Sequence, residues 1–127
     1  MPERPCSAQV RAGRLAKAKQ FLAAAELIED SLSGYVTDAY VTMCVHAGIA
    51  AADVICCVRL GRYAQGDRHA EAVALLKKAN AVDPAKRLEV LLGMKSKAGY
   101  THLPSSTTDA KKAGRAAKDL LAAAERA

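Results

Sequence analysis

The chain contains no tryptophan, and only five of its 127 residues are aromatic, namely one phenylalanine and four tyrosines. Its apolar residues are mostly alanine, leucine and valine instead. β-Sheets favour β-branched and aromatic residues, whereas alanine and leucine favour helices. The composition therefore predicts an all-α fold. The length predicts a single domain over residues 1–127, large enough to bury a core of its own.

The sequence also lacks the residue patterns of a metal site or a disulfide framework. Cys56 and Cys57 are adjacent, and on a helix they point about 100° apart, so they cannot form the two-residue-spaced pair of a zinc knuckle. The three histidines have no clustered carboxylates beside them. We therefore expect no metal ion or other cofactor. All four cysteines, including Cys6 and Cys44, are expected to be free thiols that fill the apolar core.

No stretch has the charged-then-apolar layout of a signal peptide, and no run approaches the roughly 20 apolar residues of a membrane span. Free thiols without an export signal are typical of a reducing compartment. The sequence therefore predicts a cytoplasmic protein that does not bind a membrane.

Acidic residues are fewer than basic ones, which leaves a formal net charge of +6 and a pI near 9.3. Such an excess favours an anionic partner. Two basic lines fall off the apolar faces of the first and last predicted helices. They consist of Arg11, Arg14 and Lys17, and of Lys111, Arg115 and Lys118. One hypothesis is therefore a sequence-tolerant DNA- or RNA-binding protein, because few aromatic residues are present to read bases specifically.

Apolar residues recur at intervals of three and four over about 7–32 and again over about 35–60, which predicts two long helices. Ser33-Gly34 should break the first run, and Gly61 should cap the second. The second helix is apolar on most of its faces, as is typical of a central helix. The two should form a hairpin, with the carboxylate of Asp53, in the apolar middle of the second helix, facing outward.

Three shorter helices follow. Asp67 is a reasonable N-cap for the third, and Asp83 for the fourth, where Pro84 would occupy the first helical position. The last helix should begin near Thr107 or Thr108. About five helices joined by short loops predict an antiparallel up-and-down bundle.

The order of these segments resembles that of a known family. After the hairpin comes Asp-Arg-His-Ala-Glu-Ala-Val-Ala-Leu-Leu at 67–76, then Met-Lys-Ser-Lys-Ala-Gly-Tyr at 94–100, and a last helix opened by Thr-Thr-Asp. From about residue 14 to 124, this order is similar to that of HEPN domains, the helical bundles found with minimal nucleotidyltransferases and in many prokaryotic toxins.

The resemblance implies two possible functions. Catalytic HEPN proteins are metal-independent ribonucleases that carry an arginine and, four to six residues later, a histidine beside the last helix. Lys97 and His102 occupy that place and spacing here, with lysine where the arginine should be, and Lys95 is a second cation. Lysine lacks the two-pronged fork that orients a phosphate, whereas histidine titrates near neutrality as acid–base chemistry requires.

The leading hypothesis is therefore a non-catalytic HEPN-like module that binds a protein, a nucleotide or RNA. The alternative is a ribonuclease toxin that uses Lys97 and His102. In either case Lys97, Tyr100 and His102, with Lys95 nearby, are expected to converge at one end of the bundle. Whether the chain is an enzyme stays open, with the missing arginine favouring no.

Two other histidines are expected to be structural. Arg62 and His69 have a similar spacing, but they bracket the loop between the second and third helices, so His69 should fix that loop. His46 should be a half-buried histidine beside the apolar stripe of the second helix. The apolar faces of that helix and the habit of the family also predict a homodimer. A nucleotidyltransferase or another protein is a further possible partner.

Overall fold

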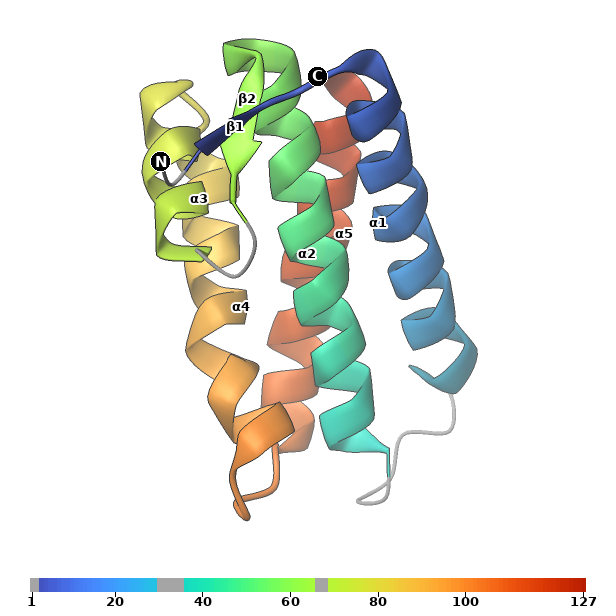
Figure 1. The fold of residues 1–127 in the computed structure, drawn as a ribbon. Helices are drawn as coiled ribbons and strands as arrows, with labels where there is room; N and C mark the ends of the chain where they lie inside the picture. The colour runs from blue at the N-terminus through green and yellow to red at the C-terminus, as the bar shows by residue number, and fades with distance from the viewer. Residues whose placement is uncertain (1–2, 30–35, 66–68) are drawn as a thin grey trace.

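The computed structural model of the chain describes residues 3–29, 36–65 and 69–127, and within them it is the expected all-α bundle (Figure 1). Its helices are α1 (Ala8–Glu29), α2 (Thr37–Leu60), α3 (His69–Lys78), α4 (Val82–Tyr100) and α5 (Thr107–Arg126). The four long helices run alternately down and up, with α1 beside α2 as a hairpin, and the short α3 lies against α4 at one end. The predicted fold class is thus confirmed.

α2 lies at the centre of the bundle, where it packs against the other four helices. By length and composition alone α2 could cross a membrane, although no run of the sequence was expected to be apolar enough to do so. However, 78% of its apolar window is buried inside the bundle, as expected of a central core helix. The homodimer was predicted because α2 is apolar on several faces. The other helices of the same chain cover those faces, so they no longer support the homodimer, which stays a prediction.

Local signals set several helix ends. The Ser7 hydroxyl accepts a hydrogen bond from the backbone N–H of Val10 at 3.1 Å and so caps α1. Gly61 ends α2 as predicted, in the left-handed conformation with φ 71°. Ser106, rather than a threonine, caps α5, because its side chain and that of Asp109 each accept a hydrogen bond from the other's backbone N–H, a capping box.

Other predicted boundaries differ from the structure. α4 begins at Val82 with Ala81 at the N-cap, so Asp83 lies in the first turn instead of capping the helix. The carboxylate still lies where the helix dipole favours it. The predicted break at Ser33-Gly34 and the predicted cap at Asp67 lie outside the described residues.

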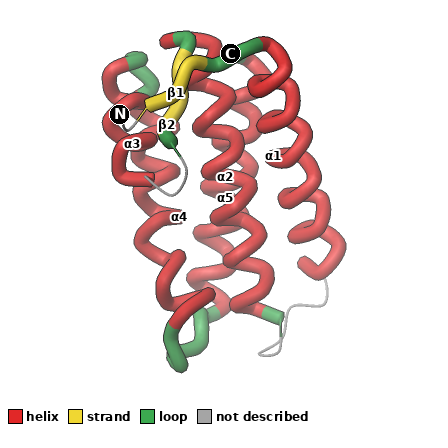
Figure 2. Tube along the Cα trace, viewed as in Figure 1, coloured by secondary structure: helices red, strands yellow, loops and turns green. Residues whose placement is uncertain are grey.

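The chain also forms a small sheet that its composition did not predict (Figure 2). Strand β1 (Glu3–Pro5) pairs antiparallel with β2 (Arg62–Ala64), which lies where a loop between the second and third helices was expected. The sheet crosses one end of the bundle and directs the N-terminal segment to the start of α1. Two strands of three residues are too few to change the fold class.

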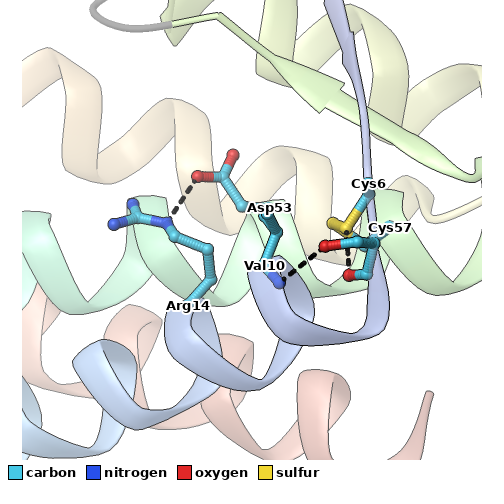
Figure 3. Close-up of a disulfide and its surroundings, with 6 residues drawn as sticks. Cys6, Val10, Arg14, Asp53 and Cys57 are labelled. Atoms are coloured by element: carbon cyan, nitrogen blue, oxygen red, sulfur yellow. Dashed lines mark hydrogen bonds and ion pairs between the residues drawn. A yellow bond between two sulfur atoms is a disulfide. The ribbon is translucent and has the colours of Figure 1, made fainter.

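This pairing brings Cys6 next to the last turn of α2, where it forms a disulfide with Cys57 (Figure 3). The two residues are 51 positions apart in sequence, with 5.4 Å between their Cα atoms. The expectation that all four cysteines are free was therefore wrong for this pair, because cysteine spacing carries no information about long-range strand pairing. It was correct for Cys44 and Cys56, which are free and buried.

The disulfide removes one premise of the predicted cytoplasmic location. Disulfides persist mainly in oxidising compartments, whereas the prediction assumed that every thiol is free. The location therefore remains a prediction that no feature of the fold tests.

Candidate ligand-binding site

The four residues predicted to bind a ligand lie at the end of the bundle where α4 passes into the loop before α5. Lys95, Lys97 and Tyr100 belong to the last two turns of α4, and His102 follows in the loop. Residues two positions apart on a helix point about 200° apart. Lys95 and Lys97 therefore point in different directions. Lys97, Tyr100 and His102 lie at one end of the bundle, but of these three only Tyr100 lines a hollow between α2 and α4.

Lys95 and Tyr100 line a hollow between α2 and α4, with a volume of about 160 Å³. Its lining residues are Thr42, Val45, His46, Lys95, Gly99 and Tyr100. The set contains one lysine and two rings but no acidic side chain. Gly99 has nothing within 4 Å of the position that a Cβ would take, so the backbone of α4 leaves space beside the Tyr100 ring.

The two rings of this hollow come from different helices. The Tyr100 side chain is 79% exposed, so a ligand can reach its face. His46, expected to be half-buried, is instead exposed on α2. It stacks on Phe21 of α1, with ring centroids 5.1 Å apart and an interplanar angle of 28°. This contact with a second ring fixes the orientation of the imidazole. The hollow thus has one anchored ring, one accessible ring and one cation.

Lys97 is directed away from the hollow. Its ammonium group lies 3.3 Å from Oδ2 of Asp109 and joins the last turn of α4 to the first turn of α5. The pKa of Asp109 is lowered, chiefly by the hydrogen bond from the Ser106 backbone N–H and then by Lys97. Lys97 therefore already neutralises a carboxylate that caps a helix, and it is not held ready for a phosphate.

His102 lies exposed in the loop between α4 and α5. Neither it nor Lys97 lines the hollow that Lys95 and Tyr100 share. The loop itself is fixed at both ends, since Thr101 bonds to Lys97 and the Ser105 N–H donates to Asp38 of α2 at 2.8 Å. Lys97 is thus paired with Asp109, and the ribonuclease role of Lys97 and His102 stays a prediction.

Arg62 and His69, the other arginine and histidine with a similar spacing, lie in a different part of the fold. Arg62 lies in β2, where its guanidinium forms an ion pair with Glu3 of β1 and ties the two strands together. His69 is the first residue of α3. Arg62 is thus committed to the small sheet, in agreement with its expected structural role.

The basic lines are only partly free. Arg14, expected to face solvent, is directed inward and lies 2.9 Å from Oδ2 of Asp53 on α2 (Figure 3). Asp53 was expected to face outward but is only 6% exposed. Burial raises the pKa of Asp53 to about 6, although the charge of Arg14 opposes this shift.

On the opposite side of the bundle, Lys111, Arg115 and Lys118 do share one hollow, of about 570 Å³. Two carboxylates, Glu29 and Asp119, line the same hollow and offset much of that charge. Glu29 Oε1 accepts hydrogen bonds from the Tyr40 hydroxyl at 2.8 Å and from Lys118 at 3.1 Å. These two contacts lower the pKa of Glu29, with the Tyr40 hydrogen bond as the larger cause.

No group of three histidine, cysteine or acidic side chains that could hold a metal ion occurs among residues 3–29, 36–65 and 69–127. The two free thiols are also poor ligands and nucleophiles. Burial raises the pKa of Cys44 to about 11 and that of Cys56 to about 12, so both stay protonated near neutrality.

No family model, curated protein or solved structure matches the chain. The resemblance to HEPN domains therefore stays a prediction, and the site has to be interpreted from its own geometry.

Sequence reasoning found Lys95 and Tyr100 but missed His46 and Phe21. A weak signal was present: Phe21 is the one phenylalanine of the chain, and His46 follows Thr42 at the spacing of one helical turn. Nothing in the sequence shows, however, that α1, α2 and α4 are rotated so that these side chains come together.

Proposed function

We propose that this chain is a non-catalytic, HEPN-like helical module that binds a nucleotide, either free or as an unpaired residue of RNA. The observation that supports it best is the hollow in which Tyr100, His46 and Lys95 surround an apolar floor without any acidic neighbour. A nucleobase needs a ring face on which to stack, and its phosphate needs a cation. The hollow offers both, but at about 160 Å³ it is smaller than the usual small-molecule site of about 300–1,000 Å³, so part of the nucleotide would remain in solvent.

The charge of the whole chain supports an anionic ligand. The formal net charge is +6, and the hollow has the same sign as the molecule. A nucleotide phosphate would therefore be attracted over a distance before it meets Lys95. The single lysine fits binding of one nucleotide better than tracking of a long backbone.

The proposal is tested by calorimetric titration with adenosine monophosphate and, separately, with a short unstructured oligoribonucleotide. Loss of a stacking ring typically costs about 1–3 kcal/mol per base, so Tyr100→Ala should weaken binding by about tenfold. Lys95→Gln should also weaken it and reduce its dependence on salt. Lys78→Gln, which removes an exposed charge on α3, is the matched control and should leave the affinity unchanged.

The two titrants distinguish the possible sources of the nucleotide. Binding of both supports a free-nucleotide site, whereas binding of only the oligoribonucleotide supports an RNA-binding module. If neither binds, or if Lys78→Gln weakens binding as much as Lys95→Gln, the hollow is not a nucleotide site.

The absence of catalysis is tested by incubating the protein with mixed-sequence RNA in the presence of a chelator. We expect the RNA to stay intact for two reasons. Lys97 stands where catalytic HEPN proteins have an arginine, and Lys97 is paired with Asp109. Cleavage that disappears in His102→Ala would show that the ribonuclease alternative is correct.

A further inference from the structure

Another hollow lies at the opposite end of the bundle from Tyr100, and the proposed function does not use it. It has a volume of about 480 Å³ and is enclosed by the end of α2, the turn between α3 and α4, and the last turns of α5. Small-molecule sites commonly have volumes of about 300–1,000 Å³. The space is therefore large enough for a small organic ligand.

Three guanidinium groups from three different helices line this hollow: Arg59 of α2, Arg87 of α4 and Arg126 of α5. Two are held in place by other contacts. Arg59 donates to the carbonyl oxygen of Ala79 at 3.2 Å, and Arg87 lies 3.3 Å from Oδ2 of Asp119. Because these side chains are already positioned, a ligand that meets them loses less conformational entropy on binding.

The floor between the arginines is apolar and includes Val82, Pro84, Ala122 and Ala123. Two carboxylates, Asp83 and Asp119, also line the hollow. Its three arginines therefore outnumber its two acidic residues, and the lining has a net positive charge. The N-cap position of α4 also opens here, and Ala81 supplies no side-chain cap. The partial positive charge of that helix end adds to the arginine charge.

We propose that this arginine hollow binds a small organic oxyanion, with phosphate or carboxylate groups on the guanidinium forks and an apolar portion on the floor. Arginine holds such groups through two parallel hydrogen bonds, which a lysine cannot provide. In the absence of ligand Oδ2 of Asp119 lies 3.3 Å from Nε of Arg87, and the ligand displaces this carboxylate. Arg59, Arg87 and Arg126 bind the ligand, whereas Asp119 competes with it for Arg87.

The test measures saturable binding of two probes, phenyl phosphate and succinate, by two-dimensional amide and arginine Nε–H NMR spectra at constant ionic strength. Resonances of residues 79–83 and of the Arg87 side chain should shift with at least one probe. Arg126→Gln and Arg87→Lys should each weaken that binding by about tenfold, the second because it keeps the charge and loses the fork.

Asp119→Asn provides the most diagnostic result. Removing the competing carboxylate should tighten binding of the probe several-fold, which a purely structural role of the Arg87–Asp119 pair would not produce. That pair is about half exposed, so its loss should cost little stability and all variants should fold. Arg115→Gln is the matched control, since it lies on the same helix 11 residues before Arg126, about 16 Å along the axis.

Tightening by Asp119→Asn, together with weakening by the two arginine variants and none by Arg115→Gln, supports the site. The preferred probe then identifies the anionic group. If neither probe binds saturably, if Asp119→Asn fails to tighten binding, or if Arg115→Gln weakens it equally, the proposal is overturned. None of these outcomes depends on whether the Tyr100 hollow binds a nucleotide.

Discussion

At the scale of single residues, Asp53 is the least expected ionised group in the chain. Its carboxylate lies within the apolar middle of α2, with Arg14 of α1 as its partner at 2.9 Å. An ion pair inside a protein often fails to recover the full cost of removing two charges from water. The pKa of about 6 shows the same balance, because burial outweighs the attraction of Arg14.

This balance predicts how stability depends on pH. The folded pKa of Asp53 lies above the ordinary value of 3.8, so the folded state holds the proton more tightly than the unfolded state does. The contribution of Asp53 to stability is therefore complete below pH 4 and is lost as the pH rises through about 6. The difference amounts to as much as about 3 kcal/mol.

Asp53→Asn removes this titration and preserves the shape of the side chain. In urea unfolding at several pH values, the stability of the wild type relative to the variant should decrease between pH 4 and pH 7. A difference that stays constant, or one that increases with pH, would show that the carboxylate is not held as the structure indicates.

At the scale of elements, close helix contacts depend on small residues at particular positions. Gly114 of α5 lies directly against the hydroxyl group of Tyr40, and a methyl group at this glycine would overlap that oxygen. The Tyr40 side chain has little freedom to move, since it is buried and its hydroxyl donates to Glu29. The glycine therefore allows α2, α5 and the end of α1 to share one hydrogen-bonded junction.

Gly114→Ala should consequently destabilise the protein by about 1–3 kcal/mol, the usual cost of overpacking a core. Gly13→Ala is the matched control, because Gly13 lies within α1 with no atom within 4 Å of the position of its Cβ. That substitution should stabilise the helix by about 0.5–1 kcal/mol. Thermal unfolding should show a lower melting temperature for Gly114→Ala and a higher one for Gly13→Ala. A similar decrease in both variants would refute the packing explanation.

The N-terminus of α5 shows how one element can be assembled from several signals. Ser106 and Asp109 form the capping box, and Lys97 of α4 pairs with the same Asp109 carboxylate. Because Asp109 has a lowered pKa, its contribution to stability is present above its ordinary range and is lost as the pH falls through the folded value. Its slope with pH is thus opposite to that of Asp53.

At the scale of the whole molecule, the Cys6–Cys57 disulfide joins the N-terminal segment to the end of the central helix. A cross-link that closes a loop of about 50 residues reduces the entropy of the unfolded chain by an amount worth about 4 kcal/mol. The small sheet of β1 and β2 is held beside it, so the bond also fixes that end of the bundle.

Reduction of the disulfide should therefore lower the urea midpoint of the wild type to that of Cys6→Ser. The variant itself should be unaffected by reductant, since its three remaining cysteines, Cys44, Cys56 and Cys57, would all be free thiols. Equal midpoints for the oxidised and reduced wild type would show that the bond contributes nothing to stability.

Local patterns were sufficient to predict the helices, the central position of α2 and the glycine that ends it. Each of these depends on residues within a few positions of one another, and the helical repeat brings such residues onto one face. Lys95 and Tyr100 came instead from the resemblance to HEPN domains, and their role as ligand-binding residues stays a prediction.

The remaining features depend on how separate segments meet, and only the tertiary structure decides that. Cys6 meets Cys57, Arg14 reaches Asp53, and His46 comes to lie beside Tyr100 only after the helices take their rotations about their own axes. Those rotations result from packing the whole core at once, so no short stretch of sequence specifies them. The sequence by itself thus determined which segments are helical, whereas packing determined which side chains share a site.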